Sequence, residues 1–178
     1  MTELVTETLT DGYRWLRVAD EAWEDPLDTT FAQHHGGRWN PKGSYPTLYL
    51  NENLATARAQ LDKMLEDSPV RADDLDQGYV LIVATLPSRQ TVADGIAEAG
   101  IAALGLPGTY PFDESGEVVS HRVCQAVGVD IKQQGLRGVH SRSAATPDGT
   151  GHELAWFPAR PSSKATAVGK PIPFREWW

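Results

Sequence analysis

This chain of 178 residues has one cysteine, lacks a long apolar run and does not open on basic residues. Its one cysteine, Cys124, excludes an internal disulfide framework and a zinc site built on cysteines, and its place on an apolar helix face predicts a buried thiol. No apolar run approaches the roughly 20 residues that cross a bilayer. The opening residues MTELVTETLTDG are acidic and polar, unlike a secretory signal. We therefore expect a cytoplasmic protein that does not associate with membranes.

Positive charge is also in short supply. The chain carries 16 Lys and Arg residues against 24 Asp and Glu, which gives a formal net charge of −8. Such a field repels a nucleic-acid duplex unless basic residues gather on one face, and the sequence has no Lys/Arg cluster. Direct nucleic-acid binding is therefore not expected. A phosphate-bearing small molecule would need a local arginine to overcome the same repulsion.

Motifs that mark common catalytic sites are missing. The chain has no GxGxxG or GxxxxGK[ST] phosphate loop, no HExxH helix and no GxSxG nucleophile turn. Its histidines also lack the usual spacing of metal ligands. His34 and His35 are adjacent and point to opposite sides of an extended chain, and the others lie in different predicted elements: His121, His140 and His152. No metal site is expected.

The order of the predicted elements favours an α+β fold. Alternating or densely β-branched runs predict strands at 12–18, 36–40, 47–51, 79–87, 136–143 and 152–159, with 172–178 as a closing strand. A helix capped by Asn51 or Asn53 should run to Leu65, and another should lie within 117–135, whereas 91–105 is ambiguous. The inward face of the second helix should hold Val119, Val123, Ala126 and Val127. We expect one compact domain over 1–178 with a mixed or antiparallel sheet.

The segment from Gly36 to Leu61 places polar side chains at defined positions. In a strand over 36–40, Arg38 and Asn40 point to one side and Trp39 to the other. In the strand over 47–51, Tyr49 faces away from its leucine neighbours. Helical spacing places Gln60 at the border of the apolar stripe that follows.

These residues resemble a known family. The stretch GGRWNPKGSYPTLYLNENLATARAQL resembles the opening signature of the RES domain, and GLRGVHSRSAATPDGTGHELAWFPA resembles its C-terminal signature. The resemblance covers 13–178 and implies a fold like that of ADP-ribosyltransferases. It also implies a bacterial toxin of the RES–Xre toxin–antitoxin type, which cleaves the nicotinamide–ribose bond of NAD⁺ by hydrolysis, phosphorolysis or ADP-ribosyl transfer.

The resemblance implies a set of site residues. Arg38 corresponds to the family arginine, Tyr49 to the strand tyrosine that accompanies it, and Ser143 to the family serine, with Ser141 as the fallback. Arg38 would grip a phosphate, because its planar fork matches phosphate oxygens. Tyr49 would meet the nicotinamide end, Ser143 would donate to ribose or carboxamide, and Asn40 would assist in substrate binding.

The family glutamate falls on Gln60, so this chain reads Arg-Gln-Ser where the family name reads Arg-Glu-Ser. The carboxylate of relatives would stabilise the positive charge that grows on ribose, and glutamine keeps the size and hydrogen bonding without the charge. Losing such a group costs about 10²–10³ in rate. A fast enzyme would therefore take its charge from another acid, such as Glu52 or Glu66.

The sequence also allows an interpretation other than an active enzyme. The alternative is a catalytically weak or silent relative that binds NAD⁺ or a similar nucleotide and acts mainly through a protein partner. The implied partners are NAD⁺, as substrate rather than cofactor, and a cognate Xre-type antitoxin, with self-association left open. The terminal Trp177 and Trp178 are either a contact for such a partner or part of a docked terminal strand, which we favour.

Overall fold

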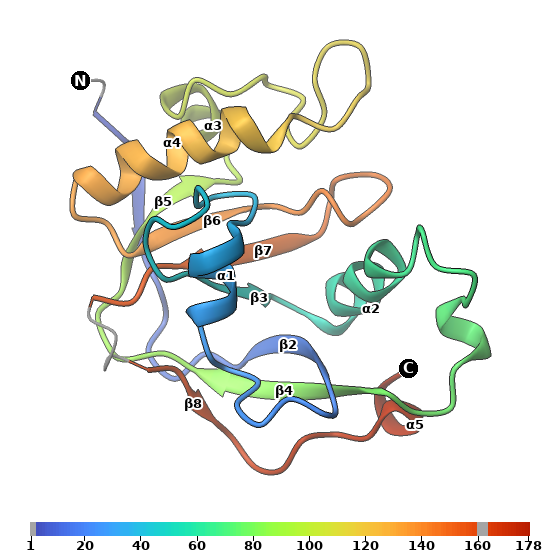
Figure 1. Ribbon diagram of the computed structural model, residues 1–178. Helices are drawn as coiled ribbons and strands as arrows, with labels where there is room; N and C mark the ends of the chain where they lie inside the picture. Colours follow the sequence, from blue (N-terminus) through green and yellow to red (C-terminus); the bar gives the residue numbers. More distant parts are fainter. Residues whose placement is uncertain (1–2, 160–163) are drawn as a thin grey trace.

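The computed structural model describes residues 3–159 and 164–178, which form an α+β fold around a mixed sheet (Figure 1). Its strands are β1 Thr6–Thr8, β2 Trp15–Asp20, β3 Leu48–Asn51, β4 Tyr79–Thr85, β5 Thr91–Gly95, β6 Gly138–Arg142, β7 His152–Trp156 and β8 Thr166–Ala167. Its helices are α1 Thr30–His35, α2 Leu54–Met64, α3 Glu98–Ala103, α4 His121–Gln133 and α5 Phe174–Trp177, with a short 3₁₀ turn at Ala72–Asp74. No helix in these ranges is both long and apolar enough to cross a membrane.

The sheet has the strand order β1-β5-β6-β7-β3-β2-β4-β8, in which β5 and β6 pair in parallel and the other neighbours are antiparallel. It nearly divides between β3 and β2, which share one register pair, Leu16 with Asn51. The guanidinium of Arg17 helps to join the halves, since it donates to the carbonyls of Tyr49 at 3.0 Å and Pro26 at 2.7 Å. Burial lowers the pKa of Arg17 to about 10, although Asp28 and Asp25 oppose the shift.

Apolar side chains cover both faces of the sheet. One face carries two clusters: one lies under α3 and α4 and includes Trp39 and Tyr110, and the other lies under α2 and α5 and includes Leu61. Figure 1 shows α3 and α4 at one end of the molecule and α2 and α5 at the other. A third cluster on the opposite face contains Leu48, Leu50, Leu154 and Trp156. The leucines of β3 therefore share a face, as alternation predicts.

The predicted strand over 36–40 is wrong. This segment is a tight loop in which Gly36 has φ +79° and the amide of Gly37 donates to the carbonyl of Asn40 at 2.9 Å. A side chain at Gly37 would collide with the ring of Tyr49. Two glycines and a close aromatic neighbour therefore favour a loop over an extended chain. Trp39 is fully buried by this loop.

The helix predicted within 117–135 exists, but its predicted inward face was only partly right: Val127 packs against the buried cluster, whereas other predicted positions do not. It begins at His121, and Ser120 caps it by accepting from the amide of Val123. Val123 is exposed, Ala126 is exposed and Val119 precedes the helix, although it is buried. The buried positions of α4 are Cys124, Gly128 and Ile131. A glycine sets this rotation, because a side chain at Gly128 would strike the backbone carbonyl of Trp39.

The ambiguous segment 91–105 contains β5 followed by α3. The closing segment 172–178 is largely helical, so its prediction as a strand is wrong beyond Ile172. Ile172 exchanges backbone hydrogen bonds with Leu81, and α5 follows. Trp177 is buried in this turn, and the indole of Trp178 donates to Asp73 at 3.0 Å. The terminal aromatics are therefore docked on their own chain, as a helical turn, because Phe174, Trp177 and Trp178 pack together only at helical spacing.

Candidate active site

The site is centred on Glu153 in β7. Register places Glu153 opposite Asn51 of β3 on one side and opposite Ser141 of β6 on the other. Opposite residues share a face, so three polar side chains lie side by side in the middle of the sheet. All three are buried. They lie on the face covered by α4 and α2, between apolar residues of the two clusters.

The carboxyl of Glu153 is nine-tenths buried and accepts a hydrogen bond from the hydroxyl of Ser143 at 2.8 Å. Burial raises the pKa of this carboxyl, while the Ser143 bond and the positive charge of Arg38 act in the opposite direction. Ser143 is itself fixed, because its amide donates to the carbonyl of Gly151 at 2.6 Å. A buried acid thus stands beside an oriented hydroxyl.

Arg38 projects from the 36–40 loop toward this acid. Its guanidinium donates to the carbonyl of Val119 at 2.8 Å and contacts the sulfur of Cys124 at 3.7 Å. Burial lowers the pKa of Arg38, but the surrounding Tyr110, Cys124 and Glu153 outweigh it and leave the pKa raised. Arg38 is therefore a permanent cation held at the edge of the buried polar group.

Tyr49 and Asn40 hold the loop that carries Arg38. The Tyr49 hydroxyl accepts from the amide of Trp39 at 2.9 Å and donates to the side-chain oxygen of Asn40 at 2.8 Å. The Asn40 amide nitrogen then donates to the carbonyl of Ala32 at 2.7 Å. Burial raises the pKa of Tyr49 well above its ordinary value. Tyr49 thus bonds the loop to β3, and Asn40, which is fully buried, bonds it to α1.

Two further residues anchor the loop from other elements. The side chain of Gln125 in α4 donates to the carbonyl of Gly37 at 2.8 Å, and the hydroxyl of Tyr45 donates to the carbonyl of Trp39 at 2.7 Å. Together with Tyr49, they bond the backbone on both sides of Arg38. The loop is consequently a rigid support for the guanidinium.

Three buried polar atoms near the acid have no hydrogen-bond partner within the described ranges: Trp39 Nε1, Tyr110 Oη and Ser141 Oγ. Burial is the largest effect on Glu153 and Tyr110 and raises the pKa of both. These groups nevertheless lie near one another, because Trp39 is close enough to Glu153, and Ser141 close enough to Tyr110, for weak hydrogen bonding to oppose that rise in pKa. Unsatisfied buried groups are rare in folded proteins and call for an explanation. Here they lie around a buried acid and a cation, which is the composition of a polar ligand site.

Comparison with known proteins assigns the family. The RES domain model matches residues 13–175. The chain belongs to the RES domain family. It also shares its fold with a chain in the crystal structure of the M. tuberculosis MbcT–MbcA toxin–antitoxin complex, with a TM-score of 0.72, 19% identity, and coverage of 98% of this chain and 90% of that chain. No curated protein matches.

Two of the residues that the RES resemblance implies, Arg38 and Ser143, act on Glu153. Ser143 donates a hydrogen bond to its carboxylate, and the charge of Arg38 lowers its pKa. Tyr49 joins them by way of the loop. Ser143 makes the contact with the acid, whereas the fallback Ser141 is the neighbour across β6 and β7. Sequence reasoning missed Glu153, although an acid inside the apolar run ELAWF of a signature was a usable signal.

Gln60, which the resemblance assigned to the RES glutamate, is half-buried in α2. It lies one turn beyond Thr56, which borders Gly151 in the loop between Ser143 and Glu153. No hydrogen bond of the described residues joins Gln60 to Arg38 or Ser143. Gln60 thus lies on α2, whereas the guanidinium of Arg38 contacts Val119 and Cys124 at α4.

The alternative acids lie elsewhere. Glu66 is exposed and pairs with Lys63 just after α2. Glu52 comes just after β3 and lies on the sheet face opposite Glu153. There its carboxylate lies beside the imidazoles of His140 and His152. Neither Glu66 nor Glu52 is therefore the acid beside Arg38.

Proposed function

We propose that the chain is a RES-type toxin that binds NAD⁺ and cleaves its nicotinamide–ribose bond, with Arg38, Ser143 and Glu153 at the centre of the site. One observation carries this proposal: a cation and a buried acid–hydroxyl pair from distant segments lie together among unsatisfied polar atoms. Family membership and the shared fold with a chain of a toxin–antitoxin complex support it.

The charges of the site suit the two ends of the substrate. Arg38 offers donors to the pyrophosphate, which the net charge of −8 would otherwise repel. Glu153 faces the part of the ligand that becomes positive, because breaking a glycosidic bond creates an oxocarbenium-like ribose. Its buried position strengthens this attraction, which grows toward the transition state and so accelerates the reaction.

The reaction balances without an additional redox group. The bond between ribose C1′ and the nicotinamide nitrogen breaks, and its electron pair leaves with nicotinamide, which becomes neutral. An oxygen of water, phosphate or a protein acceptor then bonds to C1′, and its proton passes to solvent or to the Glu153 carboxylate. Ser143 holds that carboxylate in one orientation through the 2.8 Å hydrogen bond. Tyr49 and Asn40 act as positioning residues through the loop of Arg38.

Turnover should be attenuated, because Gln60 brings no charge to its side of the site. Purified full-length protein should release nicotinamide from NAD⁺, Arg38→Ala should abolish release, and Gln60→Glu should raise it by about 10²–10³. Glu66→Gln, which alters an exposed acid on the surface, is the control. Absence of both NAD⁺ binding and nicotinamide release in the wild type would end the proposal.

The second candidate is a silent NAD⁺ or nucleotide binder that acts through a protein partner, and the uncharged Gln60 favours it. Calorimetry separates the two, since tight NAD⁺ binding without nicotinamide release identifies the binder. For either, we propose a cognate Xre-type antitoxin as the protein partner. A neighbouring gene that encodes a small helix-turn-helix protein, and that binds this chain when the two are co-expressed, would support the assignment.

A further inference from the structure

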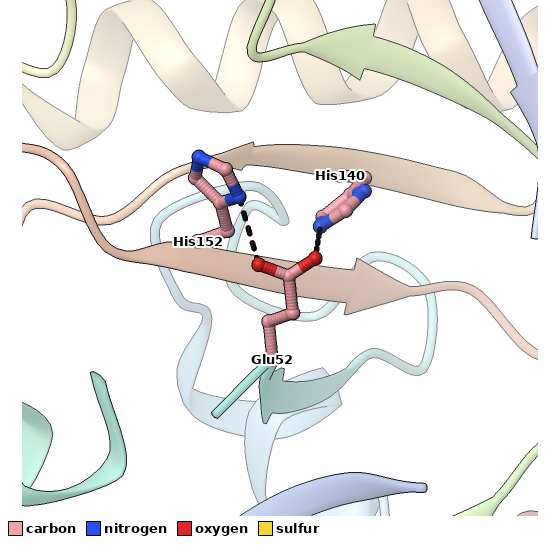
Figure 2. A group of neighbouring side chains, drawn as sticks. All are labelled: Glu52, His140 and His152. Atoms are coloured by element: carbon pink, nitrogen blue, oxygen red, sulfur yellow. Dashed lines mark hydrogen bonds and ion pairs between the residues drawn. The ribbon is translucent and has the colours of Figure 1, made fainter. Parts of the chain in front are cut away.

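A second polar cluster lies on the opposite face of the same strands. Its side chains come from Glu52, just after β3, His140 in β6 and His152 in β7, and their ligand atoms lie within 4.8 Å of one another. Figure 2 shows the Glu52 carboxylate between the imidazoles, with one oxygen toward each. Oε2 lies 2.8 Å from His152 Nδ1, and Oε1 lies 3.6 Å from His140 Nε2. Register brings these histidines together, although the sequence separates them into different elements.

His140 is the informative member of the cluster. Its side chain is only 8% exposed, and its Nδ1 lies 2.7 Å from a carboxylate oxygen of Glu7 in β1. The other nitrogen, Nε2, is buried without a hydrogen-bond partner in the described part of the chain. If the imidazole donates from Nδ1 to Glu7, the lone pair on Nε2 points at an oxygen of Glu52. Two lone pairs that face each other repel, and either a proton on Nε2 or a bound cation between them removes that repulsion.

We propose that Glu52, His140 and His152 bind a divalent transition-metal ion of the Zn²⁺ type, with solvent as the fourth ligand. Two histidines and one carboxylate form a known ligand set for such ions. In a tetrahedral site with bonds of about 2.0–2.1 Å, ligand atoms lie roughly 3.3–3.4 Å apart. The 2.8 Å contact would therefore lengthen by about 0.5 Å and the 3.6 Å contact would shorten by about 0.3 Å, from a start in which all the ligand atoms lie within 4.8 Å of one another. Glu52 and His152 are 28% and 29% exposed, which leaves solvent access to the open position.

The surroundings hold the proposed ligands in place. Glu7 acts on His140 Nδ1 as the outer carboxylate that commonly orients a metal-bound histidine. The ring of Trp15 packs edge-on against His140 at 5.3 Å between centroids, and Tyr13 donates to the backbone carbonyl of Glu52 at 3.0 Å. The site thus joins β1, β3, β6 and β7 on the face behind Glu153. This metal site is independent of the proposed NAD⁺ chemistry.

Calorimetric titration of tag-free, chelator-treated full-length protein with Zn²⁺ tests the proposal. We expect one ion per chain, loss of binding in His152→Ala and Glu52→Gln, and binding of unchanged stoichiometry but about 10–100-fold weaker in Glu7→Gln. The matched control replaces His34 and His35, an exposed pair remote in sequence, with alanine and should bind as the wild type does.

Cobalt spectroscopy provides a readout that needs no variant. Co²⁺ added to the wild type should give the intense visible absorption of a four-coordinate site, and Zn²⁺ should displace it. A wild type that binds no Zn²⁺, or a Co²⁺ spectrum of the weak hexa-aqua type, overturns the proposal. Loss of binding in the His34/His35 variant with retention in His152→Ala overturns it as well.

Discussion

The substitution Glu153→Gln removes the negative charge at the proposed active site while it keeps the shape of the side chain. Glutamine has nearly the volume of glutamate, and its carbonyl oxygen can accept the hydrogen bond that Ser143 now donates to Oε2 at 2.8 Å. Folding should therefore change by only about 1 kcal/mol, the typical net value of one hydrogen bond. Turnover should fall by about 10²–10³, or about 2.7–4 kcal/mol, because the charge that stabilises the ribosyl cation is gone.

The same variant tests the environment of the acid through pH. The pKa of Glu153 is raised from its ordinary value of 4.5 by burial, so the folded state holds the proton more tightly than the unfolded state does. Ionisation of Glu153 therefore lowers the free energy of unfolding of the wild type. The loss begins as pH rises past the pKa of the unfolded state and is complete above the pKa of the folded state. Glutamine does not titrate. The stability of the variant relative to the wild type should therefore increase as pH rises from the ordinary value of 4.5 to above the raised pKa.

Nicotinamide release in single turnover measures the first effect, and urea unfolding across that pH range measures the second. Glu66→Gln is the matched control, since it removes an exposed carboxylate that pairs with Lys63 on the surface. Release at the wild-type rate by folded Glu153→Gln would refute the role assigned to this acid. Parallel pH profiles of wild type and variant would refute the raised pKa.

The remaining predictions concern the support of the site. Arg38→Lys should weaken NAD⁺ binding in calorimetry by about 10–100-fold, because an ammonium cannot reproduce the planar fork. Tyr49→Phe leaves two buried hydrogen-bond partners unpaired and should cost about 1–3 kcal/mol for each in urea unfolding. Gly128→Ala should cost about 1–3 kcal/mol in the same assay through collision with the Trp39 carbonyl, whereas Gly108→Ala, with open space around it, should be nearly neutral. Equal stabilities of the two alanine variants would contradict that packing.

Elements whose pattern is local were predictable from the sequence. The α+β class, the leucine face of β3 and the α2 helix follow from periodicity and an asparagine cap, and Asn53 does accept from the amide of Thr56 at 2.9 Å. The predictions failed at positions whose structure is set by tertiary contacts rather than by local sequence. The rotation of α4 depends on how closely Gly128 approaches the 36–40 loop. Because that loop is remote in sequence, the periodicity of 117–135 contains no information about it.

The site was predictable in part for the same reason. Arg38 and Ser143 lie in signature motifs, so the resemblance alone pointed to them. The acid Glu153 stands out within the apolar run ELAWF, but its position beside Ser141 follows only from the register of β6 and β7. The same register is needed to bring His140 and His152 together. These strands are polar on both faces: in β6, His140 faces the cluster with Glu52 while Ser141 faces the acid, and in β7 His152 and Glu153 divide in the same way.

A strand that is polar on both faces gives no clear period of two, which hides its function from pattern analysis. It is also costly, because each buried polar group needs a partner. In β6 and β7 the partners are other side chains of the same two sites: Ser143 for Glu153, and Glu52 and Glu7 for the histidines. Five buried side-chain atoms in the described ranges still lack partners. Four of them, in Trp39, Tyr110, Ser141 and His140, border either the proposed NAD⁺ site or the proposed metal site, whereas the fifth, Nε1 of Trp177 in α5, borders neither. Since natural sequences rarely leave such groups unsatisfied, their division between the two faces is the physical reason to expect a ligand on each.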